Sequence, residues 1–322
     1  MMNCERSLGA LTCAIVAAFL GCRSSDARPS DAQDAPAPSN RMFIPTNLHT
    51  RLVENSVGVT SVTQPGIIFG LNDSGHEPLL FAFDSTGRSR GVWRVNGARN
   101  LDWEAAASGP CEAGSDRRCL YIGDVGDNDA RKPTVTVYRV AEPIVPSAPA
   151  DRRAAPDAGL PAARVLQIRY PDSPHDVEAL YVTPAGDLFL ITKRRLLDAA
   201  RRPRQALIYR VPATAWRSSG TATATLVDSL PIVPGDWPGR QVTDAALSAD
   251  GSKLAVRTYA EVYVFPVDVA TGLPSAGGRP AVCMILDLNE RQGEGIGWWW
   301  DQRRLLLTSE GNGEPLRVIE CQ

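Results

Sequence analysis

The chain has 322 residues, 43% of them hydrophobic, so it is long enough to bury a sizeable core. Its formal net charge is −2, and its basic residues do not gather into a stripe interleaved with aromatic residues. Because nucleic-acid binding needs such a patch to neutralise phosphates, we expect no nucleic-acid partner.

Residues 1–21 have the features of a secretory signal peptide. An apolar run from Leu8 to Leu20 closely precedes Cys22. The run is too short to span a bilayer, which takes about 20 apolar residues. The letters FLGC resemble the lipobox of bacterial lipoproteins, and this resemblance implies a lipid anchor on Cys22 and a location in the cell envelope. An ordinary cleaved signal is the alternative.

Residues 22–43 are rich in Asp, Ala, Ser and Pro, a composition that cannot bury a core. We expect a disordered tether here and a single folded domain over residues 44–322. Export implies an oxidising compartment, which permits disulfides.

Two cysteines are placed to close a hairpin. Cys111 and Cys119 enclose EAGSDRR between two predicted strands and lack the additional His or Cys ligands of a zinc site. The sequence therefore predicts a disulfide between them. The pairing of Cys283 and Cys321 stays open.

From residue 45 onward, short strand-like runs alternate with Gly, Pro, Asp and Asn, without a sustained helical period. The runs align as five units of four strands. The first three units hold 56–62, 67–73, 79–84; 91–95, 101–107, 119–125, 134–140; and 165–170, 176–182, 187–192, 206–211. The last two hold 225–230, 242–248, 253–259, 262–267; and 282–288, 294–300, 304–309, 315–320.

One position recurs near the start of an apolar strand in every unit, and it is acidic in four of them. It holds Gly58, Glu104, Glu178, Asp244 and Glu294, at spacings of 46, 74, 66 and 50 residues. A four-stranded propeller blade takes about 40–50 residues, and the longer spacings contain insertions.

The sequence therefore predicts an all-β fold, a β-propeller of five four-stranded blades, with six blades as an alternative. Residues 141–163 form a proline-rich insertion. An N-terminal strand around His49 to Val53 is predicted to complete the last blade and close the ring. A β-sandwich is the other candidate fold, but it gives no reason for one acid to recur in register.

In a propeller, the loops that lead into the innermost strand and those that leave the second strand lie on one face. Nine further polar residues are therefore predicted to share a ligand-binding rim: Asp73, Asp102, Asp124, Asp127, Asn128, Asp176, Lys193, Arg257 and Glu310. Carboxylates that converge there raise each other's pKa unless a cation compensates them.

Calcium is the favoured cation because it takes six to eight oxygen ligands in flexible geometry. We expect Glu104, Glu178, Asp244 and Glu294 to be its ligands. The basic residues of the same rim are a second possible source of compensation. In a third interpretation, each acid binds backbone amides of the neighbouring blade without any ligand.

Several motifs resemble those of exported bacterial β-propeller lipoproteins of uncharacterised function. They are NDSG, DWE, YIGDVGDN, YPDSPHDVEAL, ITKR, VTDAALSADGSKLAVRTY and GEGIGW, spread over residues 56–320. The D-x-E-[AG] pattern is distantly similar to β-propeller phytases and to phytase-like and SdiA-regulated propellers. The phytase resemblance implies calcium on the four acids and phosphate contacts from Lys193 and Arg257.

Three functions follow from these observations. The first is a lipid-anchored envelope module whose calcium-loaded rim binds a small-molecule ligand or a protein partner. The second is a calcium-dependent phosphoesterase, in which the ion polarises the substrate and activates water. The third is a scaffold in which the acids hold the blades together.

Overall fold

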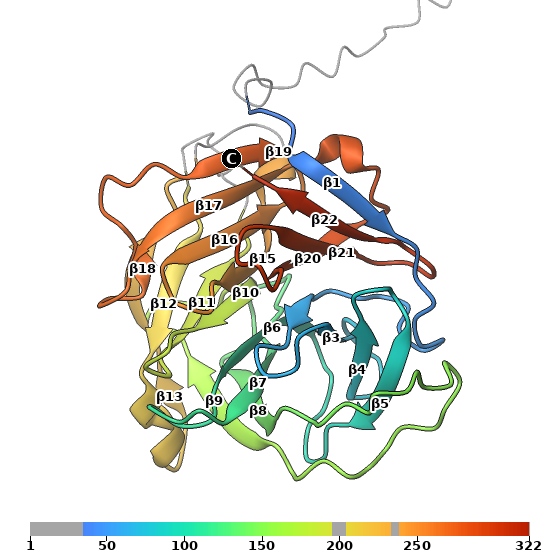
Figure 1. The fold of residues 1–322 in the computed structure, drawn as a ribbon. Helices are drawn as coiled ribbons and strands as arrows, with labels where there is room; N and C mark the ends of the chain where they lie inside the picture. The colour runs from blue at the N-terminus through green and yellow to red at the C-terminus, as the bar shows by residue number, and fades with distance from the viewer. Residues whose placement is uncertain (1–34, 195–203, 233–237, 322) are drawn as a thin grey trace, which may run out of the picture.

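The structure, a computed structural model, describes residues 35–194, 204–232 and 238–321. Five β-sheets surround a central axis, which confirms the prediction of a five-bladed β-propeller (Figure 1). One strand of each sheet lines the axis: β2 (Val59–Thr60), β6 (Trp103–Pro110), β10 (Val177–Val182), β15 (Val242–Leu247) and β20 (Gly293–Trp298). The predicted signal peptide, Cys22 and most of the tether lie outside the described residues.

Each blade continues outward from its inner strand in antiparallel order. Blade 1 adds β3 (Ile67–Gly70), β4 (Leu79–Asp84) and β5 (Ser89–Arg94); blade 2 adds β7 (Arg118–Asp124), β8 (Val135–Ala141) and β9 (Arg164–Arg169). Blade 3 adds β11 (Leu188–Thr192), β12 (Leu207–Val211) and β14 (Thr225–Ser229); blade 4 adds β16 (Lys253–Thr258), β17 (Glu261–Asp268) and β19 (Ala281–Met284). Blade 5 adds β21 (Leu305–Ser309), β22 (Leu316–Glu320) and β1 (Ser39–Ile44).

Two short strands extend this pattern: β13 (Ala222–Thr223) pairs with β9, and β18 (Leu273–Pro274) pairs with β17. In the part of the chain that the structure describes, three 3-10 helices lie in the connections: η2 (Ala213–Arg217), η3 (Pro238–Arg240) and η4 (Leu286–Leu288). Within the described ranges, no helix has the length and apolar character needed to cross a membrane.

The sequence units are offset from the blades by one strand. The first strand of units two to five is the outermost strand of the preceding blade, namely β5, β9, β14 and β19. A repeat period shows how long a unit is but not where it begins, because strand pairing between neighbours is decided by hydrogen bonds across the sheet.

The predicted closure of the ring by an N-terminal strand is confirmed, but the segment differs. Strand β1 pairs with β22, so residues that were expected to be the end of the tether complete blade 5. His49–Val53 instead turns back on itself, with the Leu52 amide bonded to the His49 carbonyl at 3.0 Å. The buried imidazole of His49 lies 3.0 Å from the Ala154 carbonyl oxygen, so this run packs against the proline-rich insertion.

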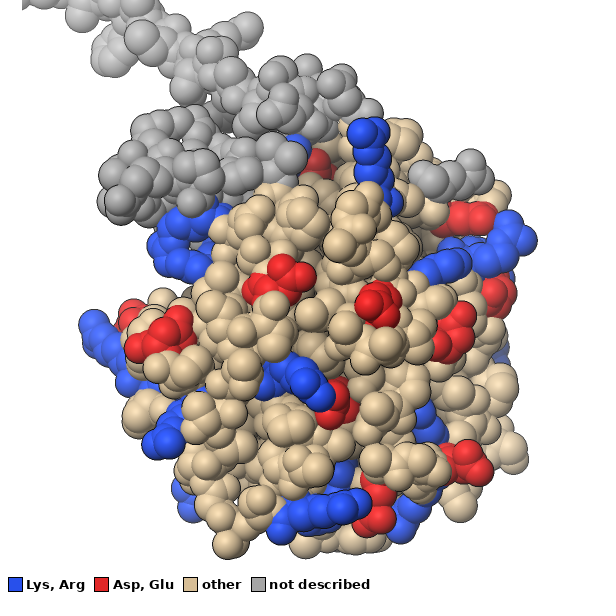
Figure 2. Space-filling model, turned by 90° about the vertical axis from the view of Figure 1, so that its left-hand side faces the viewer, with Lys and Arg blue, Asp and Glu red and all other residues tan. Residues whose placement is uncertain are grey.

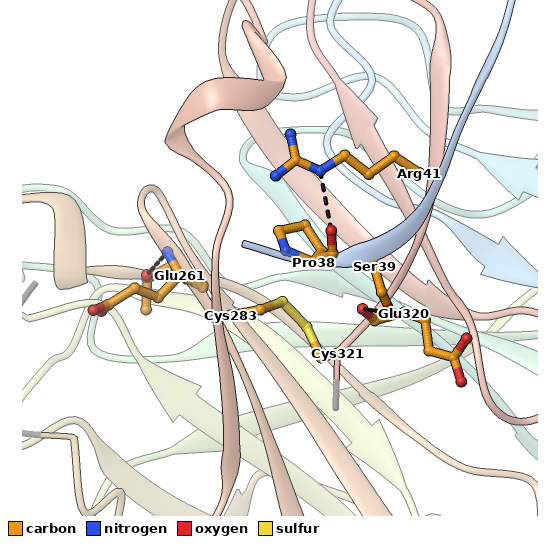
Figure 3. The surroundings of a disulfide bond; sticks show 8 residues. Pro38, Ser39, Arg41, Glu261, Cys283, Glu320 and Cys321 are labelled. Carbon is orange, nitrogen blue, oxygen red and sulfur yellow. Dashed lines mark hydrogen bonds between the residues drawn. A yellow bond between two sulfur atoms is a disulfide. The ribbon is translucent and has the colours of Figure 1, made fainter. Parts of the chain in front are cut away.

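Both disulfides are present in the structure. Cys111 and Cys119 join the hairpin between β6 and β7 as predicted, and Cys283 pairs with Cys321. The second bond links the outer strand of blade 4 to the end of blade 5, beside strand β1 (Figure 3). There the Ser39 hydroxyl donates to the Glu320 carbonyl at 3.3 Å, so strand β1 is held against the end of blade 5 next to this disulfide.

The inner strands are buried almost throughout, whereas the outer strand β9 alternates between exposed and buried residues. Small residues such as Gly58, Ala106, Ala245 and Gly297 line the channel on the face opposite the predicted rim. They allow five strands to approach one axis. On the outer face shown in Figure 2, acidic and basic side chains are interspersed.

Candidate functional site

The four acids predicted as metal ligands lie near the starts of the inner strands, and all are buried. Their exposed fractions are 8% for Glu104, 2% for Glu178, 1% for Asp244 and 4% for Glu294. Burial raises the pKa of each, and the charge of Glu178 further raises that of Glu104. The charge of Glu294 does the same for Glu178 and Asp244.

A β-bulge lies at the acidic position of the inner strands. In β6 the ladder register shifts at Glu104, between Trp103 and Ala105, and β10 shifts in the same way around Glu178. Strand β20 is irregular at Glu294 as well. A bulge leaves the extra residue unpaired and redirects its side chain. This explains how a strand that is otherwise apolar carries a carboxylate at the start of the channel.

Asp244 is one residue out of register with the other acids. The shift in β15 falls between Val242 and Asp244, so the bulged residue is Thr243. The Thr243 hydroxyl donates to the Glu294 carbonyl at 2.9 Å. Because side chains alternate along a strand, a slip of one residue turns Asp244 away from the direction of the glutamates.

Gly58 is also displaced from the repeated position. In blade 1 the register shifts by one residue between the Asn55–Asn72 bridge and the Val59–Phe69 pair. The Ser56 amide bonds to the Leu71 carbonyl at 3.2 Å, which places Ser56 next to that shift. Around the ring the equivalent side chains are therefore Ser56, Glu104, Glu178, Thr243 and Glu294.

The contacts of Asp244 are those of a link between blades. Its carboxylate accepts hydrogen bonds from two backbone amides, that of Ile296 in blade 5 and that of Ala245, the next residue along β15, each at 2.8 Å. Both oxygens are thus used, and burial raises the pKa of the side chain well above its ordinary value. The expectation that Asp244 holds a metal does not fit this geometry, whereas the amide-binding interpretation does.

One group of acids has the geometry of a cation site. Asp73, Asp102 and Glu104 each offer a carboxylate oxygen, and these oxygens lie within 4.8 Å of one another. Asp73 comes from the loop after β3, while the other two come from the start of blade 2. Burial, the charge of Glu178 and then that of Asp73 raise the pKa of Glu104 to about 11.

Lys132 is the ammonium group beside this cluster. Its Nζ lies 2.7 Å from the Asp102 carboxylate and donates to the Gly126 carbonyl at 2.5 Å. One ammonium beside three carboxylates leaves negative charge that a hard, oxygen-preferring cation fits. We call Asp73, Asp102, Glu104, Glu178 and Glu294 the acidic mouth.

Lys193 compensates the other side of the acidic mouth. Its Nζ lies 3.0 Å from Glu178 and 5.5 Å from the ring centre of Tyr259. Burial alone lowers the pKa of this lysine, but the charges of Glu178, Tyr259 and Glu294 outweigh burial and raise it. Burial still raises the pKa of Glu178 to about 8, so the ion pair offsets only part of the cost.

Glu294 belongs to a hydrogen-bonded group on the blade 5 side. Gln292 donates to Glu294 at 3.0 Å and to Glu310 at 2.9 Å, while the Tyr259 hydroxyl lies 3.4 Å from Glu294. Burial and the charge of Glu294 raise the pKa of Glu310 to about 7. Gln292, Tyr259 and Glu290 also line a cavity of about 290 Å³ beside the acidic mouth.

Other predicted rim residues mainly hold the loops. Asp124 accepts the amides of Leu101 and Asp102, at 3.4 and 2.9 Å, and so supports the start of β6. Asp176 accepts the Asp127 amide at 2.8 Å, which ties the loop after β7 to blade 3.

Asp127 and Asn128 differ in exposure although they are neighbours in that loop. The Asp127 carboxylate is buried and accepts the Lys132 amide at 2.7 Å. Asn128 is exposed, outside the cluster of buried acids.

Arg257 is not available to a ligand. It is fully buried, and Nη1 donates to the carbonyls of Gly295 and Thr308, at 2.9 and 3.0 Å. Its Nη2 pairs with Glu290. Arg257 thus joins blades 4 and 5, and although its Nε has no hydrogen-bond partner among the described residues, its full burial does not fit the phosphate contact that the resemblance implies.

Sequence reasoning missed Lys132 and Gln292 as members of this region. Lys132 follows the GDVGDN loop, and its place after the second strand of a blade was a usable signal. Gln292 directly precedes the inner strand β20, but nothing in its residue type distinguishes it from an ordinary loop residue.

No family model and no curated protein matches this sequence. Solved structures with a similar fold include the glutaminyl cyclase of Myxococcus xanthus, 12% identical, with 88% of this chain and 95% of that one covered and a TM-score of 0.46. A luciferin-regenerating enzyme is 12% identical over 87% and 81%, with a TM-score of 0.39. A gluconolactonase from Xanthomonas campestris is 13% identical over 92% and 99%, also with a TM-score of 0.39.

At this identity the likeness concerns the fold alone. The sheet order by itself defines the class: the chain is a five-bladed β-propeller protein whose last blade is closed by an N-terminal strand.

Proposed function

We propose that this chain is a lipid-anchored β-propeller of the cell envelope, whose acidic mouth binds a divalent cation and, through it, a ligand or protein partner. Calcium is the favoured ion because the donors are carboxylate oxygens from separate loops. The observation that carries the proposal is the cluster of Asp73, Asp102 and Glu104, with oxygens within 4.8 Å of one another.

The electrostatics of Glu104 support a cation there. Without one, burial and neighbouring charges raise its pKa to about 11, so the carboxyl holds its proton at neutral pH. A divalent ion would displace that proton and use the carboxylate as a ligand. Asp244 and Arg257 bind backbone groups instead of facing the channel. The proposed cation site is therefore confined to the side of the ring that holds Asp73, Asp102 and Glu104.

Calcium titration of the purified chain tests the metal. We expect heat of binding by calorimetry and, at a calcium concentration 100 times the Kd, stabilisation by about 2.7 kcal/mol. Glu104→Gln should weaken binding at least tenfold. The matched control is Glu112→Gln, which alters an exposed carboxyl in the disulfide hairpin on the opposite face. Wild-type protein that takes up no calcium and keeps its melting temperature would remove the metal from the proposal.

The anchor rests on the apolar run before Cys22 and on the FLGC letters. Metabolic labelling with a palmitate analogue should mark the wild-type chain in a bacterial host. Cys22→Ser should abolish the label and release the protein from the membrane fraction. Label that persists in this variant contradicts the anchor while leaving the cation site untouched.

The phosphoesterase alternative is weakened by the same geometry. Of the two cations expected to contact phosphate, Lys193 pairs with Glu178 and Arg257 is buried against backbone carbonyls. A phosphate ester would have to break the first pair to gain a contact.

A further inference from the structure

A second pocket lies on the face opposite the acidic mouth, between blades 2 and 3. Its volume is about 110 Å³. The disulfide hairpin contributes Glu112 to the wall, β8 and β9 contribute Arg139 and Arg164, and η2 contributes Arg217. Three arginines thus face one carboxylate.

Arg139 is the unusual member because it is buried, with 7% of its surface exposed. Among the described residues, no carboxylate lies within ion-pair distance of its guanidinium. Asp187, which follows Gly186 of the pocket wall, pairs with Arg210 instead, at 2.6 Å. An unpaired buried charge is costly, so proteins rarely keep one without a partner.

The strand register makes this arrangement more costly still. Arg139 lies directly opposite Arg164 in the β8–β9 ladder. Like charges at opposed positions of an antiparallel pair destabilise it. Arg164 also donates to the carbonyl of Trp216, which fixes its guanidinium beside η2.

Aromatic rings supply only part of the compensation. The Arg139 guanidinium lies 4.4 Å from the ring centre of Trp216 and 5.9 Å from that of Tyr121. The ring faces attract the guanidinium electrostatically but carry no net negative charge. The Tyr121 side chain also hydrogen-bonds to Arg139, but a neutral phenol supplies no counter-charge, whereas a planar guanidinium suits bidentate hydrogen bonds to an oxyanion.

We propose that this pocket, formed by Arg139, Arg164, Arg217 and Trp216, is a binding site for an oxyanion, either a phosphate or a carboxylate group of a small molecule. The arginine forks match both groups geometrically. A bound oxyanion provides the missing counter-charge between the opposed arginines. The site is independent of the acidic mouth and of any cation there.

Binding is tested by calorimetry and thermal unfolding of the purified chain with inorganic phosphate and with succinate, each at ionic strength matched by chloride. We expect at least one of them to bind and to raise the melting temperature above the chloride reference. Phosphate-only binding identifies a phosphoryl ligand, and succinate-only binding identifies a carboxylate. If neither binds beyond the chloride reference, the proposal is overturned.

Variants locate the site. Arg139→Gln should weaken binding at least tenfold, and Arg217→Gln, which alters an exposed side chain and leaves the fold intact, should weaken it at least threefold. The control is Arg169→Gln on the same strand β9, whose guanidinium donates to Thr223 at 2.8 Å. Its affinity should stay within twofold of wild type. Equal affinity in the wild type, Arg139→Gln and Arg217→Gln places the anion elsewhere and refutes the assignment.

Discussion

The ammonium of Lys193, which directly follows strand β11, lies 3.0 Å from the carboxylate of Glu178, which belongs to the adjacent strand β10 of the same blade. Only 3% of the Glu178 side chain and 17% of the Lys193 side chain are exposed. The pair therefore joins the loop after β11 to the start of β10 inside the acidic mouth. Breaking such a pair is more damaging than replacing both members, because one charge is left buried alone.

Lys193→Met is accordingly expected to destabilise the fold by about 3 kcal/mol. The measurement is urea unfolding at pH 7. The double variant with Glu178→Gln should recover at least half of the loss, because no charge then remains unpaired. A double variant no more stable than Lys193→Met would show that the pair is not coupled.

Stability should fall as pH rises through the neutral range. The pKa of Glu104 is raised from 4.5 to about 11 and that of Glu178 to about 8, chiefly by burial. The folded chain therefore keeps protons that the unfolded chain releases above about pH 4.5. This contribution is fully present below that pH and is lost progressively as pH increases toward the folded-state values.

Each such carboxyl lowers the free energy of unfolding by up to about 1.4 kcal/mol per pH unit. Glu104→Gln, which cannot ionise, should flatten the decline between pH 5 and pH 8 relative to wild type. Denaturant unfolding at four pH values gives both slopes. Parallel slopes for the variant and the wild type would mean that Glu104 titrates normally.

Asp244→Ala separates the role of linking blades from that of binding a ligand. The change removes the acceptor of two buried amides, Ala245 and Ile296, so we expect a loss of about 2–4 kcal/mol. Calcium affinity should stay within threefold of wild type once the protein is folded. An Asp244→Ala variant with normal stability and no calcium binding would instead show that Asp244 is a metal ligand.

Gly297 allows blades 5 and 1 to approach. A Cβ there would lie 2.1 Å from the carbonyl oxygen of Gly58, which is backbone and cannot move aside alone. Gly297→Ala should cost about 3 kcal/mol by thermal or urea unfolding. Gly58→Ala is the control, since its Cβ would meet a Thr308 methyl at 3.2 Å. Equal effects of the two changes would indicate that the backbone contact is not limiting.

The number of blades could be predicted because strand-forming runs and turn residues are local signals. Repetition of four runs over about 50 residues specifies a blade, since each blade alone cannot bury its faces. The hairpin bond between Cys111 and Cys119 was predictable for the same reason, as its partners are close along the chain.

The contents of the acidic mouth were only partly predictable. Glu104, Glu178 and Glu294 share one position, but Asp244 has slipped by one residue to a position equivalent to Ala105. A bulge adds one residue to one strand, and the sequence carries no mark of it. Since side chains alternate, this single residue decides between a channel ligand and a link between blades.

The amino-acid sequence by itself determined which segments become strands and that five similar units surround an axis. Tertiary structure decided which strand closes the ring, which acids share the channel and which are paired with Lys132 or Lys193. The physical reason is the distance along the chain over which each effect acts. Strand propensity acts between neighbouring residues, whereas register, burial and charge compensation depend on groups brought together from distant parts of the chain.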